Sequence, residues 1–498
     1  MNTQTACFTS KSAASSRRPS RAAGAAMATQ RARPVAAAVA IVFGLASPLA
    51  LATNRIVSSC LDDGTPGTLR SVISAVTTVT GDTVDMSGLS CPGNVIALAT
   101  NGNHIDVSQM NLAIKGPAGS VLTIDGSALY EGVYYNHADL FQHTNTGTLS
   151  IQDLALSGGH QKHKDIVSLG GCLQSAGNVS LTNVTISSCT NSSYNLTAKG
   201  GAVYAAGNVI LNHSTISDSS NTSAKSSCRG GAIYAKGQLT LDHSTISGNS
   251  ATCFNNAKGG GLYAYGNLVA QYSAISANSA ESTDKVAYGG GLFAKSGLSV
   301  QATVISKNKA DGVYGSAGGG AKVLGNFVGN YSTIDGNKAY GSGFGAGLNL
   351  NGTTNTILGT TISNNVSQGG YSGLDVVTNG VVGSSFVSKN STISGNTANG
   401  SSGAASIDAV TTKFYNSTIA FNRAAIFPGL VLVAKNSSMD VTLQSTLMSN
   451  NTLGSGEDDL TTNTDNGHVV TFNGGNLAAL ANNLVRVTQV MNLPTDTL

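Results

Sequence analysis

Residues 200–219 read GGAVYAAGNVILNHSTISDS, and residues 230–249 repeat the pattern as GGAIYAKGQLTLDHSTISGN. The first segment divides into three short β-like runs, 201–205, 208–211 and 214–216, separated by small or polar residues. Alternation along a strand sends successive side chains to opposite faces. It therefore predicts an interior row in each copy, made here of Val203, Val209, Leu211 and Ile216, and in the next copy of Ile233, Leu239, Leu241 and Ile246.

The pattern recurs ten times with a period of about 30 residues. A fixed period of this size indicates a solenoid, in which each unit buries its apolar side against its neighbours. Three strands per turn, each paired with its equivalent one turn on, predict an all-β fold, a parallel β-helix of about ten regular coils preceded by irregular N-terminal coils. The anchor residues are Ile186, Ile216, Ile246, Ile275, Ile305, Ile334, Ile362, Ile393, Ile419 and Leu447.

An asparagine stands three residues after each of the last eight anchors. Stacked asparagines can join their side-chain amides from turn to turn, and asparagine tolerates the left-handed backbone of a tight corner. We therefore predict a structural ladder made of Asn249, Asn278, Asn308, Asn337, Asn365, Asn396, Asn422 and Asn450.

Glycine pairs from Gly200-Gly201 to Gly318-Gly319 mark a second corner, where the backbone needs a positive φ or a close approach. An aromatic column follows, which alternates with the core positions and so lies on the outer face. It is either a stack that stabilises the sheet or a strip on which sugars stack. Its members are Tyr204, Tyr234, Tyr263 and Phe293, and Lys322 takes the next equivalent position.

The first 52 residues have the features of a secretory signal peptide. Six basic residues and no acidic residue precede an apolar run from Val35 that ends in Ala50-Leu51-Ala52, and Met27 offers a more ordinary start. Without this leader the chain has 21 basic and 24 acidic residues, which gives a net charge of about −3. The basic balance of the whole chain thus comes from the leader, and we expect no nucleic-acid partner and no transmembrane segment after its removal.

Six of the seven cysteines lie outside the leader, and an even number in an exported chain indicates disulfides. Six cysteines allow 15 pairings. Sequence position favours three pairs as a hypothesis: Cys60 with Cys91, Cys172 with Cys189, and Cys228 with Cys253.

Four segments follow from these patterns: the leader 1–52, an N-terminal cap 53–92, the β-helix 93–455 and an irregular C-terminal segment 456–498, which is either a natural end or a truncation. A short amphipathic helix at 68–76 is expected to cover the first coil, because an open β-helix end is an unpaired sheet edge. The segments 190–199, 220–229 and 250–258 are expected to be long loops, so residues 190–345 are the half to search for a site.

The chain resembles exported right-handed parallel β-helix proteins of the pectin-lyase-like superfold. The resemblance lies in Gly201-Ala-Val-Tyr, in Gly231-Ala-Ile-Tyr and in the Ser-Gly-Asn corner that follows. The chain is especially similar to bacterial proteins with polymorphic-outer-membrane-protein-like GGA[ILV] repeats, and residues 61–76 resemble their N-terminal capping segment. The resemblance covers roughly residues 55–455 and implies this fold and export. The superfold hosts lyases, hydrolases, adhesins and tail spikes, so it does not name an activity.

We expect an exported bacterial β-helix protein that is non-catalytic, with a surface or secreted glycan-binding, adhesin-like or scaffold role, and that lies outside the cell, on the outer-membrane surface or in the periplasm. The alternatives are a polysaccharide lyase or glycoside hydrolase with a site on the 190–345 loops, and a passenger-type virulence protein. No catalytic residue, cofactor or metal is assigned, and the partner expected is a polysaccharide or cell-surface glycan. His213 and His243 lack a third metal ligand, and Asp458-Asp459 are expected in a solvated loop.

Overall fold

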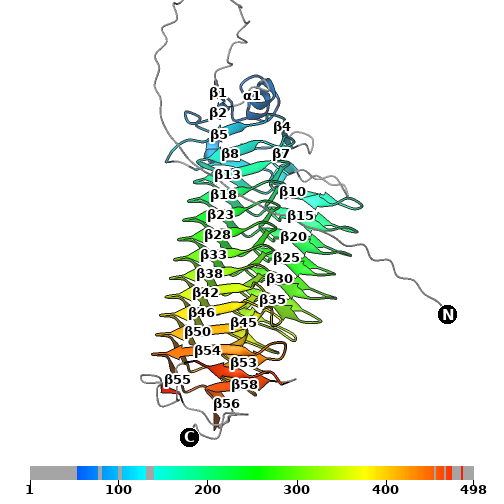
Figure 1. Cartoon of the computed structure of the whole chain (residues 1–498). Helices are drawn as coiled ribbons and strands as arrows, with labels where there is room; N and C mark the ends of the chain where they lie inside the picture. The colour runs from blue at the N-terminus through cyan, green and yellow to red at the C-terminus, as the bar shows by residue number, and fades with distance from the viewer. Residues whose placement is uncertain are drawn as a thin grey trace, which may run out of the picture. The chain divides into compact units, whose positions relative to one another are not determined.

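The computed structural model describes residues 53–76, 81–98, 104–119, 121–129, 139–453, 456–464, 467–473 and 484–485. The expected leader 1–52, with its alternative start Met27, lies outside the described residues. The described residues from 53 to 485 form a parallel β-helix, which confirms the predicted fold class (Figure 1). It has about 13 turns, slightly more than the ten regular coils counted from the repeat, because the N-terminal coils share the same sheets.

Five sheets run along the rod, and we call them sheets A to E. Sheet A has 15 strands, from β1 (Asn54–Ile56) to β59 (Val470–Phe472). Sheet B has 14, from β3 (Val95–Ala97) to β60 (Leu484–Val485). Sheet C has 13, from β4 (Ile105–Val107) to β58 (Leu460–Thr464). Sheet D has 12, starting at β10 (His160–His163), and sheet E has 6, starting at β11 (Ser168–Leu169).

One turn shows how the sequence makes these sheets. It passes through β16 (Ala198–Lys199), β17 (Val203–Ala205), β18 (Val209–Asn212), β19 (Thr215–Ser217) and β20 (Ser220–Ser223), which belong to sheets E, C, A, B and D. Each strand pairs in parallel with its equivalent in the next turn, as Ile216 does with Ile246. The predicted interior residues Val203, Val209, Leu211 and Ile216 are all fully buried and belong to one continuous core.

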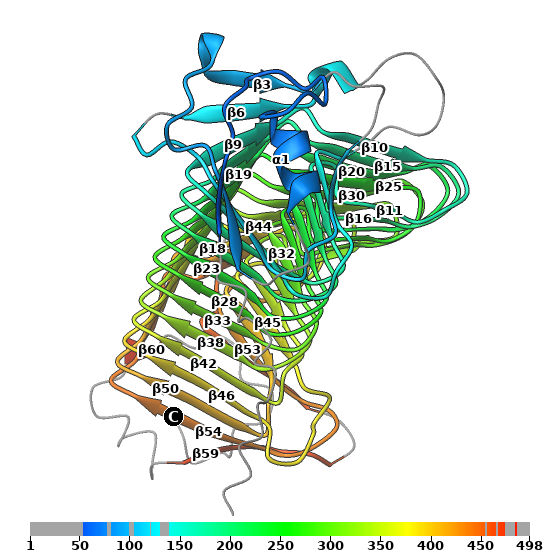
Figure 2. The same ribbon diagram turned by 90° about the horizontal axis from the view of Figure 1, so that it is seen from above.

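Sheets D and E form a fin on the side of the rod, and Figure 2 shows it projecting from the stacked turns. The prediction of long loops at 190–199, 220–229 and 250–258 is therefore wrong. Each segment contains two short strands, one that leaves the rod and one that returns to it. Small side chains let the two strands pack closely, and they make a second core of their own. That core contains Ala198, Cys228, Ala251, Cys253, Ala257, Ala280, Ala287 and Ala310. The strands of sheet E are β11, β16, β21 (Cys228–Arg229), β26 (Ala257–Lys258), β31 (Ala287–Tyr288) and β36 (Ser316–Ala317).

The three cysteine pairs favoured by position are all disulfides. Their Cα–Cα distances are 5.6 Å for Cys60–Cys91, 5.5 Å for Cys172–Cys189 and 5.9 Å for Cys228–Cys253, within the ordinary range. The last pair joins sheet E of one turn to sheet D of the next, so it links successive turns of the fin.

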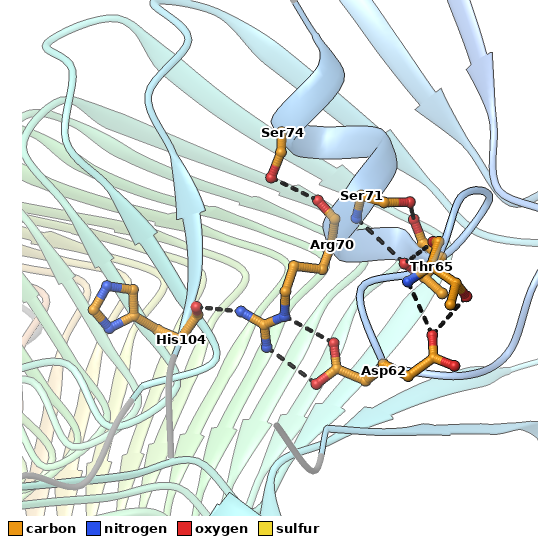
Figure 3. Close-up of polar contacts among 8 residues, drawn as sticks. Asp62, Thr65, Arg70, Ser71, Ser74 and His104 are labelled. Atoms are coloured by element: carbon orange, nitrogen blue, oxygen red, sulfur yellow. Dashed lines mark hydrogen bonds and ion pairs between the residues drawn. The ribbon is translucent and has the colours of Figure 1, made fainter. Parts of the chain in front are cut away.

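Helix α1 (Leu69–Ala75) covers the first turns, close to the range expected for the cap (Figure 1). Its Leu69 and Ile73 are buried, and Thr68 accepts a hydrogen bond from the Ser71 amide as N-cap. Figure 3 shows Arg70 holding both carboxylate oxygens of Asp62, at 2.9 and 3.1 Å, while it donates to the His104 carbonyl at 2.6 Å. Arg70 thus fixes the helix to β4, at the start of sheet C.

The asparagine ladder lies at the corner after sheet B. From Asn249 to Asn422, each Nδ2 donates to the Oδ1 of the next asparagine at 2.8–3.0 Å. The last member is Asn451, so the prediction of Asn450 is wrong. Met448, not Leu447, pairs with Ile419, and this moves the register by one residue. Asn450 is exposed with a φ of 57°.

The C-terminal segment does not lose the repeat at residue 456, as the sequence suggested. β58, β59 and β60 add one further strand each to sheets C, A and B. Asp458 and Asp459 are 6% and 0% exposed, so the expected solvated loop is wrong as well. Most of residues 474–498 lie outside the described residues.

Candidate functional site

The glycine corner joins sheet E to sheet C and sets the geometry of the candidate site. Gly200, Gly230, Gly259 and Gly289 have φ values of 70°, 71°, 72° and 63°. A Cβ at Gly230 would collide with the carbonyl oxygen of Ile233. The backbone therefore turns sharply here, and the outer face of sheet E comes to lie beside the outer face of sheet C.

The aromatic column lies on the outer face of sheet C, at the centre of β17, β22 (Ile233–Ala235), β27 (Leu262–Ala264) and β32 (Leu292–Ala294). Ring centroids are 5.4, 5.0 and 5.1 Å apart, with interplanar angles of 11° or less. Tyr234, Tyr263 and Phe293 are only 4–5% exposed. Tyr234 and Tyr263 are stacked on both ring faces, so the column favours the stabilising stack over a sugar-stacking strip. The prediction that Tyr204, Tyr234, Tyr263 and Phe293 form a sugar-stacking strip is not supported by this packing.

Three cations from sheet E cover these rings, and we call Lys199, Arg229 and Lys258 the basic strip. They occupy one register position of three successive strands, so they stand directly above one another. Lys199 Nζ lies 5.5 Å from the Tyr234 ring centroid. Arg229 Cζ lies 5.8 Å from the Tyr263 centroid, and Lys258 Nζ 5.5 Å from that of Phe293. Cation–π attraction holds the strip in place.

The basic strip carries a concentration of positive charge. Burial and the nearby Arg229 guanidinium lower the pKa of both Lys199 and Lys258. In the described part of the chain, none of the three forms a salt bridge, and Arg229 Nε is buried without a hydrogen-bond partner. Like charges stacked in register are destabilising, and an orphaned buried donor costs about 1–3 kcal/mol. The strip is thus a row of positive charges without a compensating carboxylate among the described residues.

The turn after sheet C adds a second basic border. Lys236 and Lys295 are exposed there, with Tyr265 in the turn between them. Lys295 Nζ lies 3.7 Å from the Tyr265 ring centroid, and a hydrogen bond from this lysine lowers the pKa of the Tyr265 hydroxyl. In the strands of sheets C and E that bear the column and the strip, the described residues from 198 to 323 include no acidic residue.

Below the aromatic column, sheet C carries a buried polar cluster. Lys322, in β37 (Ala321–Val323), takes the position after Phe293, and Asn349 and Asp375 follow in β41 (Leu348–Leu350) and β45 (Leu374–Val377). Lys322 Nζ donates to the side-chain oxygens of Asn349 and Asn351. Asn349 Nδ2 donates to Asp375 Oδ2 at 2.6 Å. Burial lowers the pKa of Lys322 to about 8 and raises that of Asp375 to about 7.

His213 and His243 lie at another corner, between sheets A and B. Their rings are parallel with centroids 4.8 Å apart, and both residues are exposed. Their Nδ1 atoms contact Asn212 Oδ1 at 2.6 Å and Asp242 Oδ1 at 2.9 Å. Among the described residues, no group of three or more His, Cys, Asp or Glu side chains is placed to hold a metal ion.

The basic strip was missed from the sequence, although a signal was present. Each of its cations immediately precedes the first glycine of a corner pair, at 199–200, 229–230 and 258–259. The repeat therefore gave their register. The three cations lie over the rings of the aromatic column only because the corner bends sharply. Periodicity alone does not determine that bend.

Comparison with known proteins found no matching family, and no curated protein or solved structure matches the chain. Within the described part of the chain, no helix has both the length and the apolar character needed to cross a membrane.

Proposed function

We propose that this chain is an exported, non-catalytic β-helix protein that binds an anionic glycan or glycan-coated surface through the basic strip. The GGA[ILV] repeats and the features of the leader support its place among exported right-handed β-helix proteins of the pectin-lyase-like superfold. On this proposal it acts as an adhesin-like or scaffold protein outside the cell, on the outer-membrane surface or in the periplasm.

The observation that carries the proposal is the stack of Lys199, Arg229 and Lys258, which forms no salt bridge with any described residue. Adjacent parallel strands are about 4.8 Å apart, so the three charges span roughly 10 Å along the rod. A linear polymer with regularly spaced carboxylate or sulfate groups can meet them one after another. The aromatic column beneath keeps the cations raised and partly exposed.

Binding of dextran sulfate, with dextran as the uncharged counterpart, tests the proposal by calorimetry at several salt concentrations. The triple variant Lys199→Gln/Arg229→Gln/Lys258→Gln should bind about tenfold more weakly or worse, since partly exposed ion pairs contribute up to about 1 kcal/mol each. Wild-type affinity should also fall as salt rises, because exposed charges are screened.

A variant with the same change in net charge, Lys307→Gln/Lys338→Gln/Lys413→Gln, serves as the control, because these lysines lie outside the strip. It should retain most of the wild-type affinity. If both variants lost the same affinity for dextran sulfate, net charge rather than the basic strip would explain the binding. Absence of wild-type binding would overturn the proposal.

The enzyme alternative is favoured by one observation, the cluster of Lys322, Asn349 and Asp375 directly after the aromatic column. Groups with pKa values of about 8 and about 7 suit proton transfer near neutral pH. Lys322 is 9% exposed and Asp375 2%, so each is largely enclosed. Release of oligosaccharides from acidic or neutral polysaccharides by the wild type, and its loss in Lys322→Met, would establish this alternative instead.

A further inference from the structure

The corner between sheets A and B holds an exposed row of rings. His213, His243, Tyr272 and Tyr331 each follow the last residue of a sheet A strand. His213 and His243 are stacked at 4.8 Å, and His243 and Tyr272 also at 4.8 Å. Tyr272 is 50% exposed and Tyr331 66%. We call these four residues the aromatic corner.

The backbone at this corner is left-handed in every turn from Asp153 to Ser445, and the tyrosines there are strained. Tyr272 and Tyr331 both have a φ of 49°. A left-handed backbone is unfavourable in free energy for a residue with a bulky side chain, whereas glycine and asparagine adopt it readily. The neighbouring turns do use those residues, at Asn183, Gly359, Asn390 and Asn416. Strain that the fold does not require points to a function.

The row of rings is interrupted between Tyr272 and Tyr331, and we call this interruption the slot. The intervening turn has Ala302 at the same position, exposed and with a φ of 46°, so one ring is missing from the row. Two strand spacings separate the two tyrosine positions, roughly 9.6 Å. Tyr331 lies over Gly359, where an added Cβ would stand 2.6 Å from Tyr331 Cδ1. The strand spacing across Ala302 thus equals about two ring-stacking distances of about 4.5–5 Å.

The edges of the slot are polar and uncharged. Gln271, Gln301 and Asn330 end strands β28 (Leu268–Gln271), β33 (Leu298–Gln301) and β38 (Phe327–Asn330), and they pair in register. In the described part of the structure their side-chain amides have no hydrogen-bond partner in the protein. Amides both donate to and accept from hydroxyl groups.

We infer that the aromatic corner binds an uncharged pyranose unit of a polysaccharide in the slot between Tyr272 and Tyr331. The sugar ring stacks its C–H faces on the two tyrosines, while the amides of Gln271, Gln301 and Asn330 bond its hydroxyls. The sheet A strands from β18 to β38 carry Asp242 but no lysine or arginine, so a neutral sugar suits this site better than a polyanion. This inference rests on the proposed glycan-binding role but not on the basic strip.

The test measures binding of neutral hexasaccharides (cellohexaose, xylohexaose, mannohexaose and maltohexaose) to the exported chain by calorimetry and saturation-transfer NMR. At least one should bind the wild type. Tyr272→Asn/Tyr331→Asn should weaken that binding by about tenfold or more, because both stacking faces are removed. Its melting temperature should stay the same or rise, because asparagine tolerates the left-handed backbone, so lost binding will not reflect unfolding.

Two further variants sharpen the result. Ala302→Tyr places a ring in the slot and should also abolish binding, whereas Tyr314→Asn, at an exposed tyrosine of the fin, should leave it intact. Full binding by Ala302→Tyr, or no binding of any neutral hexasaccharide by the wild type, would overturn the inference. Dextran sulfate is measured with the same variants, since retained polyanion binding with no neutral binding removes this inference and leaves the proposed function standing.

Discussion

Asn451 donates its side-chain amide to Oδ1 of Asp459 at 2.7 Å, and its backbone amide bonds the same oxygen at 3.2 Å. A buried carboxylate therefore ends the asparagine ladder, at the position where the next asparagine would stand. Asn451 Nδ2 also donates to the Ile419 carbonyl at 3.0 Å, but without Asp459 its second N–H and its backbone amide would lack an acceptor.

Replacement of Asp459 by alanine should loosen the C-terminal turns. Two donors of Asn451 lose their acceptor, at a cost of about 1–3 kcal/mol for each buried orphan. Hydrogen exchange at the Asn422 and Asn451 amides should speed up markedly, with turns before Asn337 unaffected, because a solenoid opens from its ends. Asp459→Asn retains an Oδ1 acceptor and should restore protection; failure to restore it would show that charge, not the acceptor, matters.

Asn308→Leu should destabilise the middle of the rod. Asn308 Oδ1 accepts from the backbone and side-chain amides of Asn278, and its Nδ2 donates to the Ile275 carbonyl. Losing these bonds should lower the free energy of unfolding by about 1–3 kcal/mol in a denaturant titration. Asn399→Leu, at an exposed asparagine, is the matched control. An unchanged midpoint for Asn308→Leu would mean that the ladder contributes nothing to stability.

Gly230→Ala should disturb the corner on which the basic strip depends. Gly230 has a φ of 71°, and an alanine methyl would collide with the Ile233 carbonyl. The left-handed backbone alone costs alanine about 1–2 kcal/mol. Thermal unfolding should show a lower melting temperature, whereas Gly88→Ala, where nothing lies within 4 Å of the new methyl, should not. Equal melting temperatures for both variants would contradict this account of the corner.

Lys322 and Asp375 should give the protein a stability minimum between about pH 7 and pH 8. Burial raises the pKa of Asp375 from 3.8 to about 7, so the folded chain holds a proton that the unfolded chain releases, and stability falls as pH rises through that range. Burial lowers the pKa of Lys322 from 10.5 to about 8, so stability rises again from pH 8 to pH 10.5.

The double variant Lys322→Met/Asp375→Leu isolates this effect from that of the other acids. Its melting temperature, compared with that of the wild type from pH 4 to pH 10, should lack the minimum. If the two pH profiles run parallel, the buried pair does not titrate as its burial implies.

The repeat predicted the fold because a period of about 30 residues leaves a chain of short alternating strands one way to bury its apolar side. Val203, Leu211 and Ile216 could therefore be assigned to the core from their spacing, and Asn308 to a corner from its offset. The same rule failed at Asn450, because Met448 replaces the usual isoleucine and the register moves by one residue.

The positions of the basic strip and the aromatic corner depend on the angles between neighbouring sheets, which the sequence period does not encode. Sequence placed Tyr234 on the outer face of its strand, but only the bend at Gly230 brings Lys199 over its ring, and only the stacked turns close its two ring faces. Tyr272 and Tyr331 carried no signal as a pair, because they are 59 residues apart and the slot between them exists only when the turns stack. The sequence by itself determined a rod with repeated corners. Tertiary structure decided which rings are covered and which stay open, because exposure depends on the angle between neighbouring sheets rather than on the order of residues within a strand.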